Sequence, residues 1–393
     1  MAKEERRQPE LRFKGFTADW EQRKLGKICN TYSGGTPSVT DSSYYNGNIP
    51  FIRSAEINSE TTELFLTKSG LKNSSAKLVE KGSILYAMYG ATSGEVGISK
   101  INGAINQAIL AIHPHENYNS YFIMQWLRLN KEQIISTYLQ GGQGNLSGSI
   151  IKSLKIEFPN SNEQQIIGDF FNLLDKNIAL HQRKLDRLKN LKKAILQLMF
   201  PEKNHSAPKL RFNNFSEVWE QRKLSEEAVI TMGQSPNGKN YTDNPNDYIL
   251  IQGNADMKNG KVAPRVWTTQ VTKTADPKDI ILSVRAPVGD VGKTDFHAVL
   301  GRGVAGIKGN EFLYQALVWM KMFGYWTKVS TGSTFESINS TDLKNAIISC
   351  PGNNEQRRIG KFLNHLDKAV ELHQRKLDTL IELKNTYLQL LFV

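Results

Sequence analysis

The sequence contains the stretch NEQQIIGDFFNLLDKNIALHQRKLDRLKNLKKAILQLMF at residues 162–200 and a second copy, NEQRRIGKFLNHLDKAVELHQRKLDTLIELKNTYLQLLF, at residues 354–392. Apolar residues recur in both copies at steps of three and four, which is the spacing of an amphipathic helix with a heptad stripe. We therefore expect two long helices that pair through these stripes as an antiparallel coiled coil with approximate two-fold symmetry. The stripe residues are Ile167, Phe170, Leu174, Ile178, His181, Leu185 and Leu188 in the first copy, and Ile359, Phe362, Leu366, Val370, His373, Leu377 and Leu380 in the second.

Start signals precede both helices. Ser161 with Gln164, and Asn353 with Gln356, have the spacing of a capping box just after a proline. At about 1.5 Å per residue, each helix extends on the order of 55 Å, which is too long for packing within one small domain. Each helix therefore needs a partner stripe, and the other copy supplies it.

The predicted stripe contains one polar residue in each copy, His181 and His373. We interpret the two histidines as polar seam residues that fix the register of the helix pair. A metal site between the two rings is the alternative, but zinc usually takes four ligands and no Cys or third His accompanies the pair.

A second duplication marks the start of each repeat. PELRFKGFTADWEQRKL at residues 9–25 matches PKLRFNNFSEVWEQRKL at residues 208–224, and ATSGEVG at 91–97 matches APVGDVG at 286–292 more weakly. Such self-similarity indicates a repeated structural unit. The predicted organisation is a variable domain at 1–160, a helix at 161–200, a second variable domain at 201–352 and a second helix at 353–393.

The composition points to a polyanionic partner. The 393 residues carry a formal net charge of +12, and clustered Lys and Arg attract phosphate groups. The N-terminal residues lack the apolar run of a signal peptide, and no segment has the roughly 18 apolar residues of a membrane span. We expect a cytoplasmic protein without a membrane partner, whose two cysteines, Cys29 and Cys350, are reduced thiols.

Short apolar runs bounded by turn residues predict strands in the variable domains, for example at 82–89, 108–112, 248–251 and 280–284. Helical patterns occupy Ser120–Tyr138 and Glu311–Lys328. The fold class is therefore α+β, with two mixed α/β domains that alternate with the two long helices.

Motifs of catalysis are missing from the variable domains. PVGDVGKT at residues 287–294 imitates a phosphate-binding loop, but its first glycine would fall at Pro287, which has no N–H to donate. The matching stretch after Gly97 continues with Ile98 and Ser99, so we interpret the shared feature as a turn between strands. Because the Asn-Pro-Pro motif of methyltransferases and the spaced carboxylates of nucleases are also lacking, we expect a chain that is not an enzyme and binds no metal or cofactor.

Taken together, the two PxLRF…WEQRKL segments, GGTPS at 34–38, GQSP at 233–236 and the NEQ…LHQRKL helices resemble the specificity subunit of type I restriction-modification enzymes. The resemblance implies that each variable domain reads one half of a split target in double-stranded DNA. It also implies that the helices set the spacing between the halves and dock two methyltransferase subunits, in a complex with restriction (translocase) subunits. S-adenosylmethionine, ATP and Mg²⁺ would then belong to adenine methylation and DNA cleavage in those partners.

Residues that read base edges are Arg, Lys, Asn and Gln, with Ser, Thr and aromatic side chains as adaptable neighbours, and loops between strands carry them. The predicted DNA-contacting residues are Thr36, Ser38, Tyr44, Tyr45, Arg53, Gln143 and Asn145 in the first domain, and Gln234, Lys239, Tyr241, Gln252, Arg285, Arg302, Thr334 and Phe335 in the second. The competing interpretation is that these are solubilising turn residues.

Two further alternatives stay open. The basic run of Arg183, Lys184, Arg187, Lys189, Lys192 and Lys193 is interpreted as a solvated helix face rather than a DNA contact. A scaffold that binds two copies of a protein and never contacts DNA would also use the helical repeats. It would not need two divergent domains or this positive charge.

Overall fold

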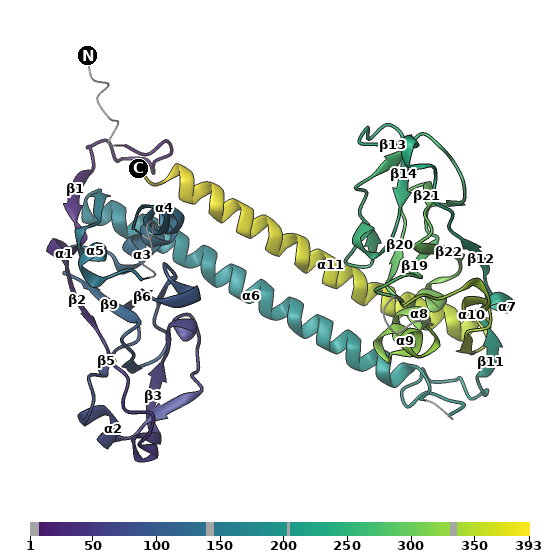
Figure 1. Cartoon of the computed structure of the whole chain (residues 1–393), viewed down its shortest axis with the longest axis horizontal. Coiled ribbons are helices and arrows are strands. Elements are labelled where there is room, and N and C mark those ends of the chain that lie inside the picture. The colour runs from purple at the N-terminus through teal and green to yellow at the C-terminus, as the bar shows by residue number, and fades with distance from the viewer. Residues whose placement is uncertain (1–7, 139–144, 203–204, 331–335) are drawn as a thin grey trace. The chain divides into compact units, whose positions relative to one another are not determined.

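The computed structural model describes residues 8–138, 145–202, 205–330 and 336–393. The chain divides into two compact units, residues 1–180 with 377–393 and residues 181–376. Each unit holds one globular domain and one segment from each of two long helices, α6 (Ser161–Met199) and α11 (Asn353–Leu390) (Figure 1). We call residues 8–160 the first globular domain and residues 205–352 the second.

The first globular domain contains two four-stranded sheets and a two-stranded ribbon. The first sheet has the order β2-β9-β6-β7 and the second β4-β3-β8-β5, in which β3 and β8 run parallel. The ribbon pairs β1 with β10. The strands are β1 (Glu21–Lys24), β2 (Cys29–Ser33), β3 (Tyr45–Ile52), β4 (Leu64–Leu66), β5 (Lys77–Val79), β6 (Ile84–Ala87), β7 (Val96–Ile98), β8 (Gly103–Ile105), β9 (Ile109–Pro114) and β10 (Lys155–Phe158).

The second globular domain repeats this topology with additions. Its sheets have the orders β12-β22-β19-β20-β16-β15 and β13-β17-β14-β21-β18, and its ribbon pairs β11 with β23. The additions are β13, β15 and β16, which extend the two sheets at their edges. The strands are β11 (Glu220–Lys223), β12 (Val229–Met232), β13 (Tyr241–Thr242), β14 (Tyr248–Ile251), β15 (Met257–Lys258), β16 (Lys261–Val262), β17 (Trp267–Thr268), β18 (Thr274–Ala275), β19 (Ile280–Ser283), β20 (Val291–Lys293), β21 (Ala298–Leu300), β22 (Val304–Lys308) and β23 (Ile347–Cys350).

The helices of the globular domains are shorter than the sequence pattern predicts. The stretch Ser120–Tyr138 forms two helices, α3 (Ser120–Leu129) and α4 (Lys131–Tyr138), and Glu311–Lys328 forms α8 (Glu311–Met322) and α9 (Tyr325–Val329). Gly324 between α8 and α9 has φ +68°, a conformation that ends a helix. Apolar periodicity continued across both breaks, so the pattern alone did not reveal them. The remaining helices are α1 (Leu25–Ile28), α2 (Lys68–Lys72), α5 (Gly148–Ser153), α7 (Leu224–Glu227) and α10 (Ser340–Lys344).

The predicted capping boxes at the starts of α6 and α11 are wrong. Ser161 is already the first helical residue, and the cap is Asn160, whose side-chain oxygen accepts a hydrogen bond from the Glu163 N–H (3.0 Å). In α11 the Gly352 carbonyl oxygen accepts from the N–H groups of Glu355 and Gln356. Gln164 and Gln356 instead donate to the carbonyl oxygens of the prolines at 159 and 351.

The weakly duplicated heptapeptides at 91–97 and 286–292 connect antiparallel strands, β6 with β7 and β19 with β20. Their matching glycines, Gly94 and Gly289, have φ values of +81° and +82°. Both positions therefore need the left-handed backbone that glycine allows. The interpretation of this motif as a turn between strands, rather than a phosphate loop, is confirmed.

Contacts between α6 and α11 occur within each unit. In the second unit, His181 Nδ1 lies 3.2 Å from His373 Nδ1, and Lys192 forms an ion pair with Asp367. In the first unit, the Phe170 and Tyr387 rings meet edge to face with centroids 5.1 Å apart. Within the second unit, α6 residues of higher number therefore contact α11 residues of lower number.

All fourteen predicted stripe residues are buried or half-buried. A second apolar position beside the stripe was missed. Phe171 and the matching Leu363 are both 0% exposed and pack in the cores of the two globular domains. Each long helix thus has two apolar faces within a unit, one toward the other helix and one toward the domain.

Candidate nucleic-acid interface

The two glycine-containing loops that follow β2 and β12 pass very close to the end of β8 and to the residue after β21, respectively. A Cβ on Gly34 would lie 1.8 Å from the Ile105 carbonyl oxygen, and one on Gly233 would lie 2.0 Å from the Gly301 carbonyl oxygen. Only glycine fits there. The next residues are held by backbone hydrogen bonds, from Gly35 N to the Ile105 oxygen (3.2 Å) and from Gln234 N to the Leu300 oxygen (2.7 Å).

These loops contact a tight turn at the same place in each domain, between β8 and β9 and between β21 and β22. The Thr36 hydroxyl donates to Gln107 Oε1 (2.6 Å). In the second domain the Arg302 N–H donates to Ser235 Oγ (3.1 Å). Strand register makes Gln107 the counterpart of Arg302, and both side chains are exposed.

A third segment joins each turn from the end of β6 or β19. Met88 N donates to the Ala108 oxygen, and Val284 N donates to the Gly303 oxygen, both at 2.8 Å. The following residues make isolated β-bridges, Tyr89 with Asn145 and Arg285 with Ser337. Tyr89 and Asn145 therefore correspond to Arg285 and Ser337.

The residue after the parallel strand β3 or β14 completes each cluster. It is Arg53 in the first domain and Gln252 in the second, and the Ile251 oxygen accepts from Gly301 N (2.7 Å). Polar groups at the carboxyl ends of parallel strands are a common place for ligand contacts. We call the set Thr36, Arg53, Tyr89, Gln107 and Asn145 the first interface, and the set Ser235, Gln252, Arg285, Arg302 and Ser337 the second interface.

The Arg53 guanidinium is already occupied. It donates to Glu56 (2.9 Å) and Glu63 (2.5 Å), while Glu56 also accepts from the Arg53 N–H. Burial works to raise the pKa of Glu56, but the hydrogen bonds from Arg53, Glu63 N and Thr62 outweigh it and lower the pKa to about 2. A base contact by Arg53 would have to break these bonds. Among the described residues, the side-chain amide of Gln252 makes one hydrogen bond, to the Tyr241 hydroxyl (3.3 Å).

The other predicted contacts are not members of these two sets. Tyr45 donates to the Pro37 oxygen and so touches the glycine loop (2.8 Å), and Ser38 is exposed beside Thr40. Tyr44 is half-buried, and Lys239 lies exposed in a short helical turn. Gln143, Thr334 and Phe335 lie outside the described residues. The structure gathers Thr36, Arg53 and Asn145 in one domain, and Gln234, Gln252, Arg285 and Arg302 in the other.

Four residues of the clusters were missed by sequence reasoning: Gln107, Tyr89, Ser235 and Ser337. The sequence carried a signal for Gln107, because AINQAI at 104–109 aligns with VLGRGV at 299–304 once both are taken as a strand, a turn and a strand. Tyr89, Ser235 and Ser337 could have been found only by aligning the diverged domains residue by residue.

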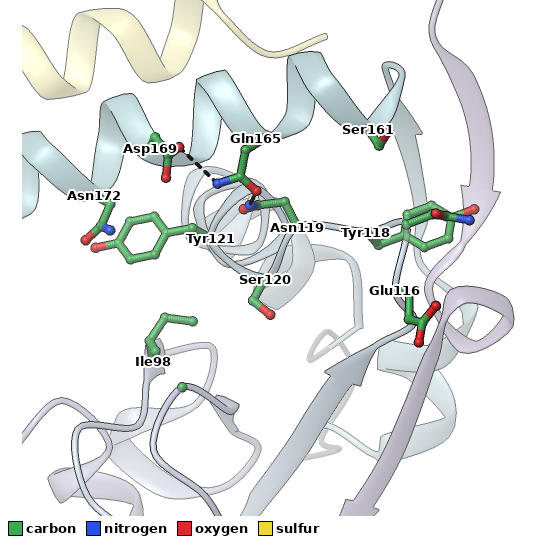
Figure 2. A pocket seen from close by; sticks show the side chains of 12 residues that line it. Ile98, Glu116, Tyr118, Asn119, Ser120, Tyr121, Ser161, Gln165, Asp169 and Asn172 are labelled. Carbon is green, nitrogen blue, oxygen red and sulfur yellow. Dashed lines mark hydrogen bonds between the residues drawn. The ribbon is translucent and has the colours of Figure 1, made fainter.

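The described pockets lie away from both interfaces. One, of about 360 Å³, lies in the first unit between the starts of α3 and α6, and is lined by polar side chains such as Asn119, Gln165 and Asp169 (Figure 2). Figure 2 shows Gln165 bonded to Asp169 and to Asn119, so these groups already satisfy one another. The other, of about 810 Å³, is mostly apolar and lies beside Phe200 and Trp319 in the second unit.

Within the described ranges, no group of three or more His, Cys, Asp or Glu side chains could hold a metal ion. Burial, the facing His373 and nearby lysines lower the pKa of His181.

Among the helices that the structure describes, none is long and apolar enough to cross a membrane.

Buried ion pairs attach each globular domain to the long helices in the same way. Arg12 binds Glu163 through two hydrogen bonds (2.7 and 2.8 Å), and Arg211 binds Glu355 at the same distances. The N–H of Leu11 donates to the Leu390 oxygen at the end of α11 (2.9 Å). In the second unit, Leu210 N donates to the Leu198 oxygen near the end of α6 (2.8 Å).

A second pair of contacts links the helices to each other and to the domains. Asp175 accepts from Lys384 (2.5 Å), Tyr121 (2.8 Å) and Gln125 (3.0 Å), while Asp367 pairs with Lys192 and accepts from Gln315 (2.7 Å). Burial works to raise the pKa of Asp175, but the charge and hydrogen bond of Lys384, the charge of Arg128 and the hydrogen bond from Tyr121 together outweigh it and hold the pKa below its ordinary value. Because Lys192 and Lys384 match one another, each copy's lysine pairs with the other copy's aspartate.

Comparison with known proteins agrees with this duplication. The family model of the type I restriction modification DNA specificity domain matches residues 17–190 and again 216–382. A putative type I restriction enzyme MjaX specificity subunit of Methanocaldococcus jannaschii is 29% identical over 298 residues, which cover 72% of this chain and 70% of that protein. The MjaVIII specificity subunit of the same organism is 20% identical over 95% of this chain and 92% of its own length.

A solved structure supports the fold. The crystal structure of the type I restriction-modification system S subunit from M. genitalium superposes with a TM-score of 0.71, at 15% sequence identity, and the match covers 98% of this chain and 99% of that one. At this identity the likeness concerns the fold. With both halves matched by the family model, the chain belongs to the family of type I restriction-modification DNA specificity proteins.

Proposed function

We propose that this chain is the DNA-recognition subunit of a type I restriction-modification system, and that each globular domain reads one half of a bipartite target. The observation that carries the proposal is the pair of interfaces, which have the same backbone but different side chains. Gln107 and Tyr89 in one stand where Arg302 and Arg285 stand in the other. Two readers of different half-sites need this combination of a shared backbone and different donors and acceptors.

The long helices act as the spacer, paired as an antiparallel coiled coil with pseudo-two-fold symmetry. The reciprocal pairs Lys384–Asp175 and Lys192–Asp367 support this pairing, because the same contact occurs once in each unit with the copies exchanged. Helices of 39 and 38 residues are about 57 Å long, which exceeds the roughly 34 Å of one DNA turn.

The catalytic steps belong to partner proteins. The chain docks two methyltransferase subunits and, with them, restriction subunits. The partners supply S-adenosylmethionine-dependent adenine methylation and ATP- and Mg²⁺-dependent cleavage. Duplicated helices favour duplicated partners, because the same surface residues are presented twice. The work of this chain is binding and positioning.

Mapping of methylated adenines tests the proposal. The full chain is co-expressed with the methyltransferase subunit of its own system in a host that lacks other adenine methylation, and modified sites are located by single-molecule sequencing. We expect a motif with two specified halves and an unspecified spacer. Exchange of residues 1–158 for those of another family member should change one half only. Methylation without a bipartite motif, or none at all with a folded complex, would favour the protein scaffold instead.

A further inference from the structure

The arginines of the globular domains fall into two groups. Outside the two long helices, and within the described residues, seven arginines form ion pairs with carboxylates and only Arg285 and Arg302 do not. The seven are Arg12, Arg23, Arg53, Arg128, Arg211, Arg222 and Arg265. The two exceptions are therefore exposed guanidinium groups that the described part of the fold leaves without a counter-charge.

Both exceptions lie in the second interface, on neighbouring segments. The hydrogen bond from Val284 N to the Gly303 oxygen (2.8 Å) joins the residue before Arg285 to the residue after Arg302, so the two arginines lie on adjacent segments. A Cβ on Gly303 would lie 2.0 Å from the Gln252 oxygen, so the backbone of the turn is packed tightly against the end of β14. Arg302 thus combines a fixed backbone with an unpaired side chain at the tip of the turn.

This combination suits the reading of a base. A guanidinium presents a planar fork of donors that matches O6 and N7 of guanine in the major groove, where it is the commonest specific contact. An arginine that only increases solubility does not require a turn fixed by contacts with the glycine loop, the segment after β19 and the end of β14. Each of the seven paired arginines has at least one donor engaged by a carboxylate of its own chain.

The first interface has a different group at the same position. Gln107 accepts a hydrogen bond from Thr36 on its amide oxygen (2.6 Å), which orients the amide, and no described residue accepts from its NH₂ group. A glutamine amide offers one donor and one acceptor side by side, which is the complement of N7 and N6 of adenine.

We infer that Arg302 specifies a guanine in one half of the target and that Gln107 specifies an adenine at the corresponding place in the other half. The inference rests on the proposed function and adds the identity of one base pair in each half. It makes Arg302 and Gln107 the residues to exchange when the target is redesigned.

The test uses the full chain in complex with its methyltransferase subunits and compares the wild type with Arg302→Gln and Gln107→Arg. We expect Arg302→Gln to replace one G by A in one half of the methylation motif, and Gln107→Arg to replace one A by G in the other half. The preference for the original base should fall about ten- to a hundred-fold in each case. Arg222→Gln, an exposed and ion-paired arginine of the same domain, is the matched control and should leave the motif unchanged.

A binding assay covers the case in which a variant methylates too weakly to map. Guanines of the wild-type motif are replaced one at a time by 7-deazaguanine, which lacks the N7 acceptor. One replacement should weaken wild-type binding about tenfold or more and leave Arg302→Gln binding unaffected.

Three results would overturn the inference while leaving the proposed function intact. First, the half of the wild-type motif that the second domain reads could lack a guanine. Second, the motif could stay unchanged in both variants. Third, Arg302→Gln could weaken binding equally for all sequences and reduce its salt dependence, as the loss of a phosphate contact does. Absence of any bipartite motif in the wild type would instead contradict the proposed function itself.

Discussion

The attachment of the domains to the long helices and the two interfaces have diverged to very different degrees. The ion pairs Arg12–Glu163 and Arg211–Glu355 agree in residue type, atoms and distance. In the interfaces two of the backbone hydrogen bonds recur, yet Gln107 stands in one interface where Arg302 stands in the other, and Tyr89 stands where Arg285 stands. The two copies kept identical residues in the ion pairs that attach the domains to the helices. They differ in the interface side chains, where each domain is proposed to read a different half-site.

The strongest test of this equivalence removes the two arginines of the attachment. Arg12→Ala leaves the carboxylate of Glu163, which is 0% exposed, without its partner, and Arg211→Ala does the same to Glu355. An unpaired buried charge costs about 3–5 kcal/mol. Urea denaturation should give that loss in free energy of unfolding for both variants.

The control is Arg23→Ala, because the Arg23–Glu21 pair is exposed and worth less than about 1 kcal/mol. Costs for Arg12→Ala and Arg211→Ala that differ by several kcal/mol would show that the two attachments are alike only in geometry.

The apolar face of the helices toward the domains can be tested on one helix. Leu363→Ala removes a side chain that is 0% exposed and should cost about 2–5 kcal/mol, because it leaves a cavity in the core of the second unit. Leu372→Ala, on the same helix with a side chain 48% exposed, should change the stability by less than about 0.5 kcal/mol. Equal effects in thermal or urea unfolding would argue against two distinct faces on α11.

The two long helices could be predicted from the sequence because the apolar residues recur at helical spacing and do so at matching positions in both copies. Every predicted stripe residue is buried or half-buried, but Phe171 and Leu363 were missed, because a helix that packs on two partners needs a wider apolar face than one stripe. The ends of the helices were predicted less well. Asn160, not Ser161, caps α6, since residues with side-chain oxygens stand at both positions and spacing alone does not choose between them.

The interfaces could be predicted only in part, for a different physical reason. Arg302 and Gln252 stand out by residue type, whereas Gln107 becomes visible only when strand register aligns it with Arg302. The contacts are made between loops distant in sequence, such as Thr36 with Gln107, and no local period encodes them. The carboxylates that occupy Arg53 could not be seen from the sequence for the same reason.

The counterparts Arg53 and Gln252 differ in charge, and pH can expose that difference. Glu56 has a folded-state pKa of about 2, below its ordinary value of 4.5. Its contribution to stability is therefore complete above pH 4.5 and is lost as the pH falls toward 2. The wild type should lose more stability than Glu56→Gln between pH 5 and pH 2 in urea denaturation.

Glu60→Gln, an exposed carboxylate beyond the same strand, should follow the wild-type curve. If the free energy of unfolding of the wild type and of Glu56→Gln changed with pH in the same way, Arg53 would not be engaged by Glu56. Arg53 would then again be a candidate for a base contact.

The smallest effect is expected on the basic face of α6. Arg183 and Arg187 are exposed, and neither has a carboxylate partner within the described residues. If the long helices only position the interfaces, Arg183→Gln/Arg187→Gln should change the DNA affinity of the methyltransferase complex less than about threefold, with an unchanged salt dependence. If the two side chains neutralise phosphates, the slope of log affinity against log salt should instead fall by about 1.8, since each contact contributes about 0.9. Titrations at several salt concentrations separate the two outcomes, because a spacer and a second electrostatic interface differ in slope even where their affinities at one salt concentration coincide.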